Sequence, residues 1–135
     1  MATEILVNDG GAPARILPFV AAVANISAGD AVAPQDVAGL DATVQPLDTG
    51  ESEYGFLGVA LTDADVGEIC NVVTGRGVVC MVNCVNTAGG KNMMPSSTAG
   101  RLAVLAGTYT GDAVLICAGT LEDNSGAGLT KCLLV

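Results

Sequence analysis

The 135-residue sequence predicts an all-β fold, a compact single-domain β-barrel or β-sandwich with an extended N-terminal arm. Two observations carry this prediction. Short runs rich in Val, Ile, Leu and Thr recur along the chain, and Gly, Asp and Asn clusters that are typical of turns separate them. No helix period fits residues 54–85, the central stretch of the chain. We see no internal repeat in the sequence and expect one domain over residues 1–135.

The N-terminal residues predict a short strand that has two possible roles. Residues 4–7 (Glu4, Ile5, Leu6 and Val7) read as a strand, and the turn cluster at residues 8–11 ends it. Such a segment is either an arm that adds to the sheet edge of a neighbouring chain or the first strand of the protein's own sheet. Residues 15–26 predict an extended strand, because Pro18 removes an amide donor and disfavours a helix.

The following segment alternates turns with short strands. Residues 27–30 predict a turn, and residues 31–33 lead from it to Pro34. Residues 35–41 predict a loop or at most one helical turn, and residues 43–47 predict a short strand in which Pro46 marks an edge position.

The central stretch, residues 54–85, predicts three consecutive strands. Residues 54–61 and 69–74 have strand composition, and the acids and Gly67 between them favour a β-hairpin. Gly75 and Gly77 flank Arg76 in a tight turn before a third strand at residues 78–85. These strands carry apolar residues on both faces, so we expect both faces to be covered.

Several motifs resemble small phage capsid decoration, or cement, proteins. They lie in residues 26–32, in the run Gly55, Gly58, Val59, Ala60, Leu61, Thr62, Asp63 and Ala64 with Gly67 and Glu68, and in the element Val72, Thr74, Gly75, Gly77 and Val78. The resemblance covers roughly residues 26–82. It implies a β-tulip-like fold, and it implies placement at three-fold or quasi-three-fold positions on the outer capsid surface.

After the central stretch, residues 86–100 predict the longest loop of the chain. Paired Met93 and Met94 are its only strongly apolar feature, and they either contact a partner or fold back on the core. Residues 102–106, 113–121 and 129–135 predict three further strands.

Charge and hydropathy limit the function classes. The net charge is −9, and the five basic residues stand singly at Arg15, Arg76, Lys91, Arg101 and Lys131. Nothing in this distribution neutralises a run of phosphates, so we expect no nucleic-acid partner. No apolar run of membrane-spanning length and no signal peptide is visible, so we expect no membrane partner and synthesis in the host cytoplasm. Charged residues make up only 14% of the chain, which favours apolar surface that is hidden in an assembly.

The residues for catalysis are sparse. The chain has no His, which removes the usual general base and the commonest metal ligand. Its five cysteines, Cys70, Cys80, Cys84, Cys117 and Cys132, are odd in number and scattered, which favours buried free thiols. The acids Asp63, Asp65 and Glu68 match no complete calcium loop and favour a solvated turn. We therefore expect no enzyme, no metal and no cofactor.

These observations lead to a structural function. We expect a virion protein on the outer surface of a phage head that binds the major capsid protein, forms a homotrimer and stabilises the shell. The candidate contact residues are Glu4, Ile5, Leu6, Val7, Arg76, Met93 and Met94. Two alternatives stay open, namely a non-viral surface-assembly subunit and a small ligand-binding β-barrel.

Overall fold

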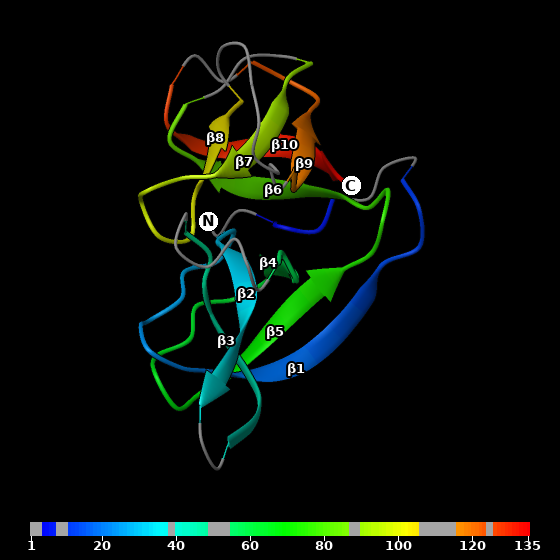
Figure 1. The fold of residues 1–135 in the computed structure, drawn as a ribbon. Helices are drawn as coiled ribbons and strands as arrows, with labels where there is room; N and C mark the ends of the chain where they lie inside the picture. Colours follow the sequence, from blue (N-terminus) through cyan, green and yellow to red (C-terminus); the bar gives the residue numbers. More distant parts are fainter. Residues whose placement is uncertain are drawn as a thin grey trace.

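The computed structural model describes residues 4–7, 11–37, 40–48, 55–86, 90–105, 116–123 and 126–135. Within these ranges the chain forms ten β-strands and no helix, so the predicted all-β fold class is confirmed. Accordingly, no helix in these ranges is long and apolar enough to cross a membrane. Figure 1 shows the strands in two groups, one stacked above the other.

The first five strands close into a barrel. They are β1 (Arg15–Ala21), β2 (Ala31–Val37), β3 (Leu40–Pro46), β4 (Gly58–Ala60) and β5 (Ile69–Thr74). Their order around the barrel is β1-β3-β2-β4-β5, with β5 pairing back to β1. The β1–β3 pair is parallel and the other pairs are antiparallel. We call this the first barrel.

The last five strands close into a second barrel. They are β6 (Val79–Cys84), β7 (Asn92–Pro95), β8 (Leu102–Val104), β9 (Ala118–Thr120) and β10 (Gly128–Leu134). Their order is β10-β6-β8-β7-β9, with β9 pairing back to β10. Here the β6–β8 pair is parallel and the others are antiparallel.

The second barrel repeats the first strand for strand. In each barrel the first strand lies between the third and the fifth, the second lies between the third and the fourth, and the first and third strands form the parallel pair. The residue pairing within each ladder is also equivalent. Adding one fixed number to the residue numbers of each strand in the first barrel gives the paired residues of the corresponding strand in the second. The corresponding pairs include Ala21–Val44 and Cys84–Leu102, Leu17–Val72 and Cys80–Cys132, Val32–Gly58 and Met93–Ala118, Pro34–Val44 and Pro95–Leu102, and Ala60–Val72 and Thr120–Cys132.

The correspondence extends to the backbone hydrogen bonds next to the ladders. Gly29 N donates to Ala60 O at 2.8 Å, and Gly90 N donates to Thr120 O at 3.0 Å. Both glycines have a left-handed backbone, with φ of 89° and 69°, which glycine adopts without strain. The two barrels are therefore one backbone design used twice, although the sequence shows no repeat.

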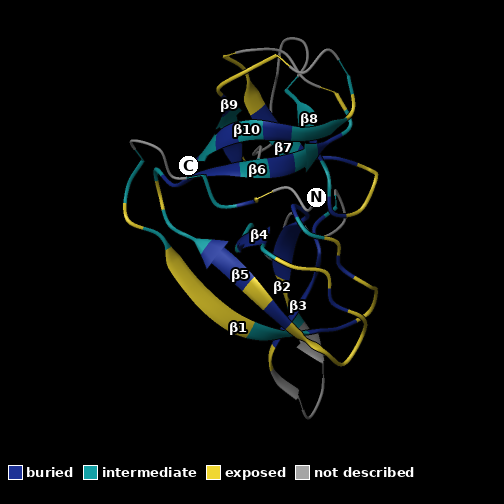
Figure 2. Cartoon of the chain, turned by 180° about the vertical axis from the view of Figure 1, so that it is seen from behind, coloured by how far each residue is buried: buried dark blue, intermediate teal, exposed yellow. Residues whose placement is uncertain are grey.

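The hydrophobic core joins the two barrels. One buried cluster draws Ala31, Ala33, Val59 and Val73 from the first barrel and also most of the interior of the second. A smaller cluster fills the first barrel alone and includes Val32, Val44, Cys70 and Val72. Figure 2 shows β4 and most of β6 buried, while β1 is largely exposed. Whether residues 1–135 behave as the predicted single domain stays a prediction.

The central strands agree with the sequence, and two predicted loops are wrong. β5 occupies residues 69–74 as predicted, and it pairs with β4 as the expected hairpin. Residues 35–41 are no loop, because β2 runs to Val37 and pairs with β3, which begins at Leu40. The predicted long loop at residues 86–100 contains β7, which pairs with both β8 and β9. In both places the strand is held by ladder partners that a local sequence pattern does not reveal.

Candidate interaction surfaces

The N-terminal segment lies against the second barrel of its own chain. Leu6 forms an antiparallel bridge with Cys80, Met81 N donates to Ile5 O at 2.8 Å, and Val7 N donates to Val79 O at 3.2 Å. Ile5 is only 4% exposed and belongs to the shared core. The structure therefore agrees with the second of the two predicted roles, in which residues 4–7 pair with a sheet of their own chain. Contact of Glu4, Ile5, Leu6 and Val7 with another chain stays a prediction.

Arg76 lies in the turn that connects the two barrels. The expected tight turn at residues 75–77 is present, but it leads from β5 of the first barrel into β6 of the second. Gly77 N donates to Leu134 O at 2.7 Å, so β10 anchors the turn. The Arg76 side chain is exposed.

A small cavity lies beside this turn. Its volume is about 130 Å³, and it is lined by Phe56, Leu57, Thr74, Gly75, Arg76, Leu134 and Val135. Typical small-molecule sites measure roughly 300–1,000 Å³, so the cavity suits one side chain of a partner better than a ligand. The Arg76 guanidinium at its rim favours a carboxylate on that side chain.

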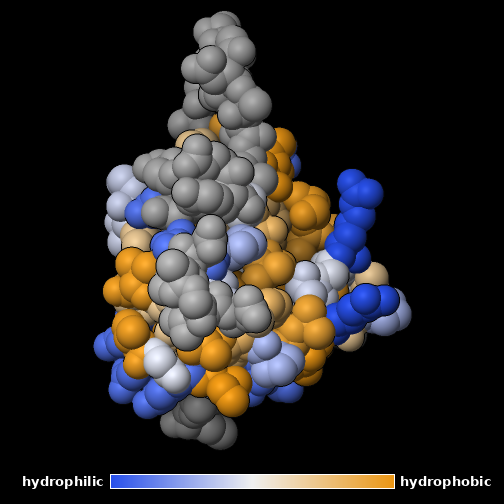
Figure 3. Space-filling view, turned by 60° about the horizontal axis from the view of Figure 1, so that its bottom comes forward, coloured by the Kyte–Doolittle hydropathy of each residue, from blue (hydrophilic) through white to orange (hydrophobic). Residues whose placement is uncertain are grey.

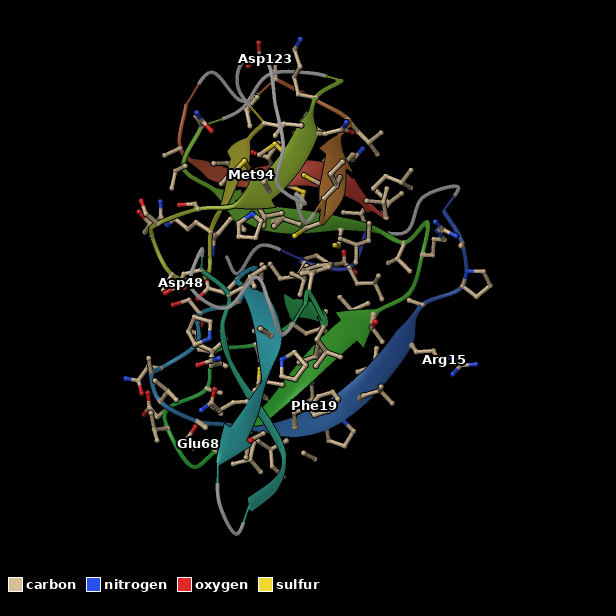
Figure 4. All side chains as sticks on the ribbon, viewed as in Figure 1. Arg15, Phe19, Asp48, Glu68, Met94 and Asp123 are labelled. Carbon is tan, nitrogen blue, oxygen red and sulfur yellow. The ribbon has the colours of Figure 1, made fainter. Side chains whose placement is uncertain are left out.

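Met93 and Met94 differ sharply in their surroundings. Met93 is fully buried in the shared core, whereas Met94 is half-buried on β7. Figure 4 labels Met94 within the second barrel. Of the two predicted roles for Met93, contact with a partner or packing on the core, the structure shows packing on the core. A buried side chain has no surface to offer, so only Met94 keeps an accessible side chain.

The structure brings some of the candidate residues together. Residues 4–7 run along the first half of β6, and Ala12 N donates to Gly77 O in the turn that carries Arg76. The N-terminal segment and Arg76 therefore lie at the same end of the second barrel. Met94 belongs to β7, which pairs with β8 and β9 and not with β6.

The five cysteines are buried and free, as the sequence predicts. Burial raises the pKa of Cys80 and that of Cys117 to about 12. A hydrogen bond with Cys84, together with burial, raises the pKa of Cys132. These three thiols therefore stay protonated at neutral pH, and a thiol in this form is a poor nucleophile and a poor metal ligand.

A polar contact at the junction of the barrels escaped the sequence analysis. Asp30 accepts hydrogen bonds from Ser27 N at 2.9 Å and from Asn83 Nδ2 at 2.8 Å, and Asn83 N donates to Gly29 O at 2.8 Å. Burial raises the pKa of Asp30, while these two hydrogen bonds act in the opposite direction. Residues 27–30 of the first barrel are thus fastened to β6 of the second. The sequence showed residues 27–30 only as a turn, because nothing near them predicts Asn83 as a partner.

The acidic turn between β4 and β5 holds three exposed carboxylates. Asp63 Oδ1 accepts a bond from Ala28 N at 2.8 Å, and Glu68 Oε2 accepts one from Asp65 N at 3.4 Å. In the part of the chain that the structure describes, no group of three or more His, Cys, Asp or Glu side chains is arranged to hold a metal ion.

The fold has a known counterpart. No protein-family model and no curated protein sequence matches the chain. Its structure is similar to the crystal structure of the N base of head fiber gp8.5 in bacteriophage phi29. The TM-score is 0.62 with 16% sequence identity, and the match covers 91% of this chain and 95% of that chain. At this identity the likeness shows a shared fold, and it includes nearly the whole of both chains.

Proposed function

We propose that this chain is a non-enzymatic structural protein of a phage head, bound to the outer surface of the shell. The observation that carries the proposal is the fold match, because it spans both barrels and nearly the entire base of a phage head fiber. The sequence motifs that resemble capsid decoration proteins lead to the same class of protein independently of the fold. Function inferred from a fold is an analogy, so it needs a direct test.

The architecture supports a passive role outside the shell. Both sheets close into barrels, and closure covers many of the strand edges through which β-proteins aggregate when they are crowded on a surface. The net charge of −9 suits a surface that faces solvent and not packaged DNA. Under this proposal the partner is the major capsid protein, and the bound copies stabilise the shell because they favour the assembled lattice over separated subunits.

The proposed assembly is a homotrimer at three-fold or quasi-three-fold positions. A trimer would hide apolar surface that 14% charged residues cover poorly. Light scattering behind a sizing column should then give about three times the 13.3 kDa chain mass. A soluble monomer of 13.3 kDa that stays monomeric on the shell would remove the trimer from the proposal.

Cosedimentation tests the function itself. The heads should come from the virus that encodes this chain, prepared without the protein. We expect the purified protein to bind them saturably and to raise the temperature at which they release DNA. Absence of binding to such heads would overturn the proposal.

Arg76 is the proposed contact with the sharpest test. Arg76→Ala should weaken binding to the heads, because a partner carboxylate would lose its charged hydrogen-bond donor. Lys131→Ala is the control, since it removes the same charge from β10 of the second barrel. Equal binding of both variants and the unchanged protein would remove Arg76 from the contact.

A further inference from the structure

Three exposed apolar side chains gather at one end of the first barrel. Val23, Ile69 and Val66 are 67%, 65% and 54% exposed, the highest values for large apolar residues in the described ranges. Val66 N donates to Asn25 Oδ1 at 3.0 Å, and Gly67 N donates to Ala21 O at 2.8 Å. Ile69 lies opposite Val20 in the β1–β5 ladder. These contacts fasten the β4–β5 turn to residues 20–25, so the three exposed residues lie on neighbouring segments, and we call them the distal patch.

Val23 is held in a strained conformation. Its φ is 71°, which lies in the left-handed region that a β-branched residue avoids. Ala24 N donates to Ala22 O at 2.8 Å, which closes a γ-turn around Val23. Ala22 N in turn donates to Val44 O at 2.8 Å, and this bond fixes one side of the turn to β3. The Val23 side chain is therefore held in solvent by a strained backbone conformation. Such strain is common at residues that take part in binding.

Carboxylates surround the distal patch. Asp63, Asp65 and Glu68 belong to the same turn as Val66, and all three are exposed. Among the described residues none of them forms an ion pair, and the bonds that Asp63 and Glu68 accept come from the backbone. In Figure 4, Glu68 lies at the end of the first barrel that is away from the second, and Arg15 lies at the other end of β1. Figure 3 turns this end forward and shows apolar and hydrophilic side chains side by side.

This chemistry selects the partner. An anionic membrane surface would repel the carboxylates. A second copy that docked through the same patch would bring its own Asp63, Asp65 and Glu68 against these carboxylates. A protein surface with an apolar centre and a rim of Lys or Arg matches both the valines and isoleucine and the acids around them.

We propose that the distal patch docks onto an apolar protein surface rimmed by basic side chains. This inference rests on the proposed function, under which that surface belongs to the coat of the head. Val66 and Ile69 supply the buried apolar contact, Val23 is presented in advance by its turn, and Asp65 and Glu68 pair with the basic rim.

Neutral substitutions test the apolar centre on the same virus heads. Val66→Ser/Ile69→Thr should weaken binding by about tenfold or more, the effect expected for residues at the centre of an interface. The matched control is Ile116→Thr/Leu121→Ser, which changes two exposed apolar residues of the second barrel. It should bind like the unchanged protein. Val23→Gly should bind more weakly and yet unfold at the same or a higher temperature, because glycine accepts the left-handed backbone.

Salt separates the contribution of charge. Asp65→Asn/Glu68→Gln should bind more weakly than the unchanged protein at low salt and should lose less affinity as salt is raised. If the affinity of this variant for heads fell with salt as steeply as that of the unchanged protein, the proposed basic rim on the partner would be contradicted.

The outcomes keep the two proposals apart. Failure of the unchanged protein to bind heads contradicts the proposed function. Normal binding by both the unchanged protein and Val66→Ser/Ile69→Thr overturns the docking role of the distal patch while the proposed function stands. A change in native mass caused by this variant would assign the patch to a second copy and overturn the basic partner as well.

Discussion

The first strands of the two barrels, β1 and β6, occupy equivalent places in the same topology but meet different surroundings. β6 is mostly buried, and residues 4–7 pair along it. β1 is exposed over its first four residues (Figure 2). At the position where Met81 donates its N–H to Ile5 O, β1 has Pro18, which has no N–H to donate. Met81 therefore lets an added strand pair with the edge of β6. Pro18 blocks such pairing at the equivalent place on β1, as prolines on strand edges commonly do.

The comparison teaches that topology and surface role are set separately. Equivalent backbone positions hold Val72 and Cys132, or Val32 and Met93, in the interiors of the two barrels. The first barrel has a core cluster of its own, and the interior of the second belongs to the cluster that both barrels share. Substitutions at equivalent positions therefore measure how differently the two barrels are stabilised.

The largest difference is expected in the cores. Met93→Ala should lower the free energy of unfolding by about 2–5 kcal/mol, because it removes a fully buried side chain from the core that both barrels share. Val32→Ala at the equivalent position should cost about 1.5 kcal/mol, because it removes only two buried methyl groups. Urea unfolding measures both values. Met94→Ala is the control, and a cost as large as that of Met93→Ala would contradict the buried assignment.

The equivalent glycines should separate strain from crowding. Gly90→Ala should cost about 1–2 kcal/mol, because alanine is disfavoured at φ of 69° and meets no atom within 4 Å. Gly29→Ala should cost about 0.5–1.5 kcal/mol more, since its new Cβ would lie 2.4 Å from Leu129 Cδ2 of the second barrel, a terminal methyl that must rotate aside. Thermal unfolding of the two variants gives the difference, and equal transition temperatures would show that the junction yields to an added methyl.

A smaller effect is expected at the junction carboxylate. Asp30→Asn should cost about 1 kcal/mol at neutral pH, because the amide keeps one acceptor oxygen where the carboxylate uses two. Since burial raises the folded-state pKa of Asp30, the stability from protonated Asp30 is fully present below the unfolded value of 3.8 and is lost as pH rises through the folded value. The deficit in unfolding free energy of Asp30→Asn relative to the unchanged protein should therefore grow as pH is lowered from 7 toward about 4.

Urea unfolding at the two pH values measures this change. Asp65→Asn serves as the control, because Asp65 is exposed. A deficit of equal size at both pH values would contradict the expected role of Asp30.

Thiol labelling tests whether the barrels open separately. Cys70 lies in the core of the first barrel and Cys117 in the shared core. Because the shared core joins both barrels, we expect both thiols to react with a maleimide over the same range of urea, as read by mass spectrometry of the peptides. Labelling of Cys70 at clearly lower urea would show that the first barrel opens alone, and a fully denatured sample should take up label at all five cysteines.

The sequence predicted the parts of the fold that have a local signal. Residues 69–74 alternate between two apolar faces and end at glycines, and β5 has these bounds. The repeat was not predicted, because equivalent positions share backbone geometry and few side chains, as Val72 and Cys132 show. β7 has four residues, too few to display a period, and it exists because β8 and β9 flank it.

The functional residues also divide into those with a local sequence signal and those that depend on distant parts of the chain. Arg76 follows from local turn chemistry and lies on the surface. The burial of Met93, the partner of Asp30 and the backbone of Val23 all depend on segments far along the chain. Sequence pattern alone could not have placed them.

The pairing of β6 determines how the protein would carry a mechanical load. Residues 4–7 and β10 both run antiparallel to β6. Ile5 O bonds to Met81 N toward the middle of β6, and Leu134 N bonds to Val78 O just before β6 begins. Tension between the two segments would therefore pull them in opposite directions along β6 and load these bonds in shear, so that they must break together. The first barrel lies between residues 4–7 and β6 in the chain, but residues 4–7 bond directly to β6. Force applied to these two segments would therefore not be transmitted through the first barrel.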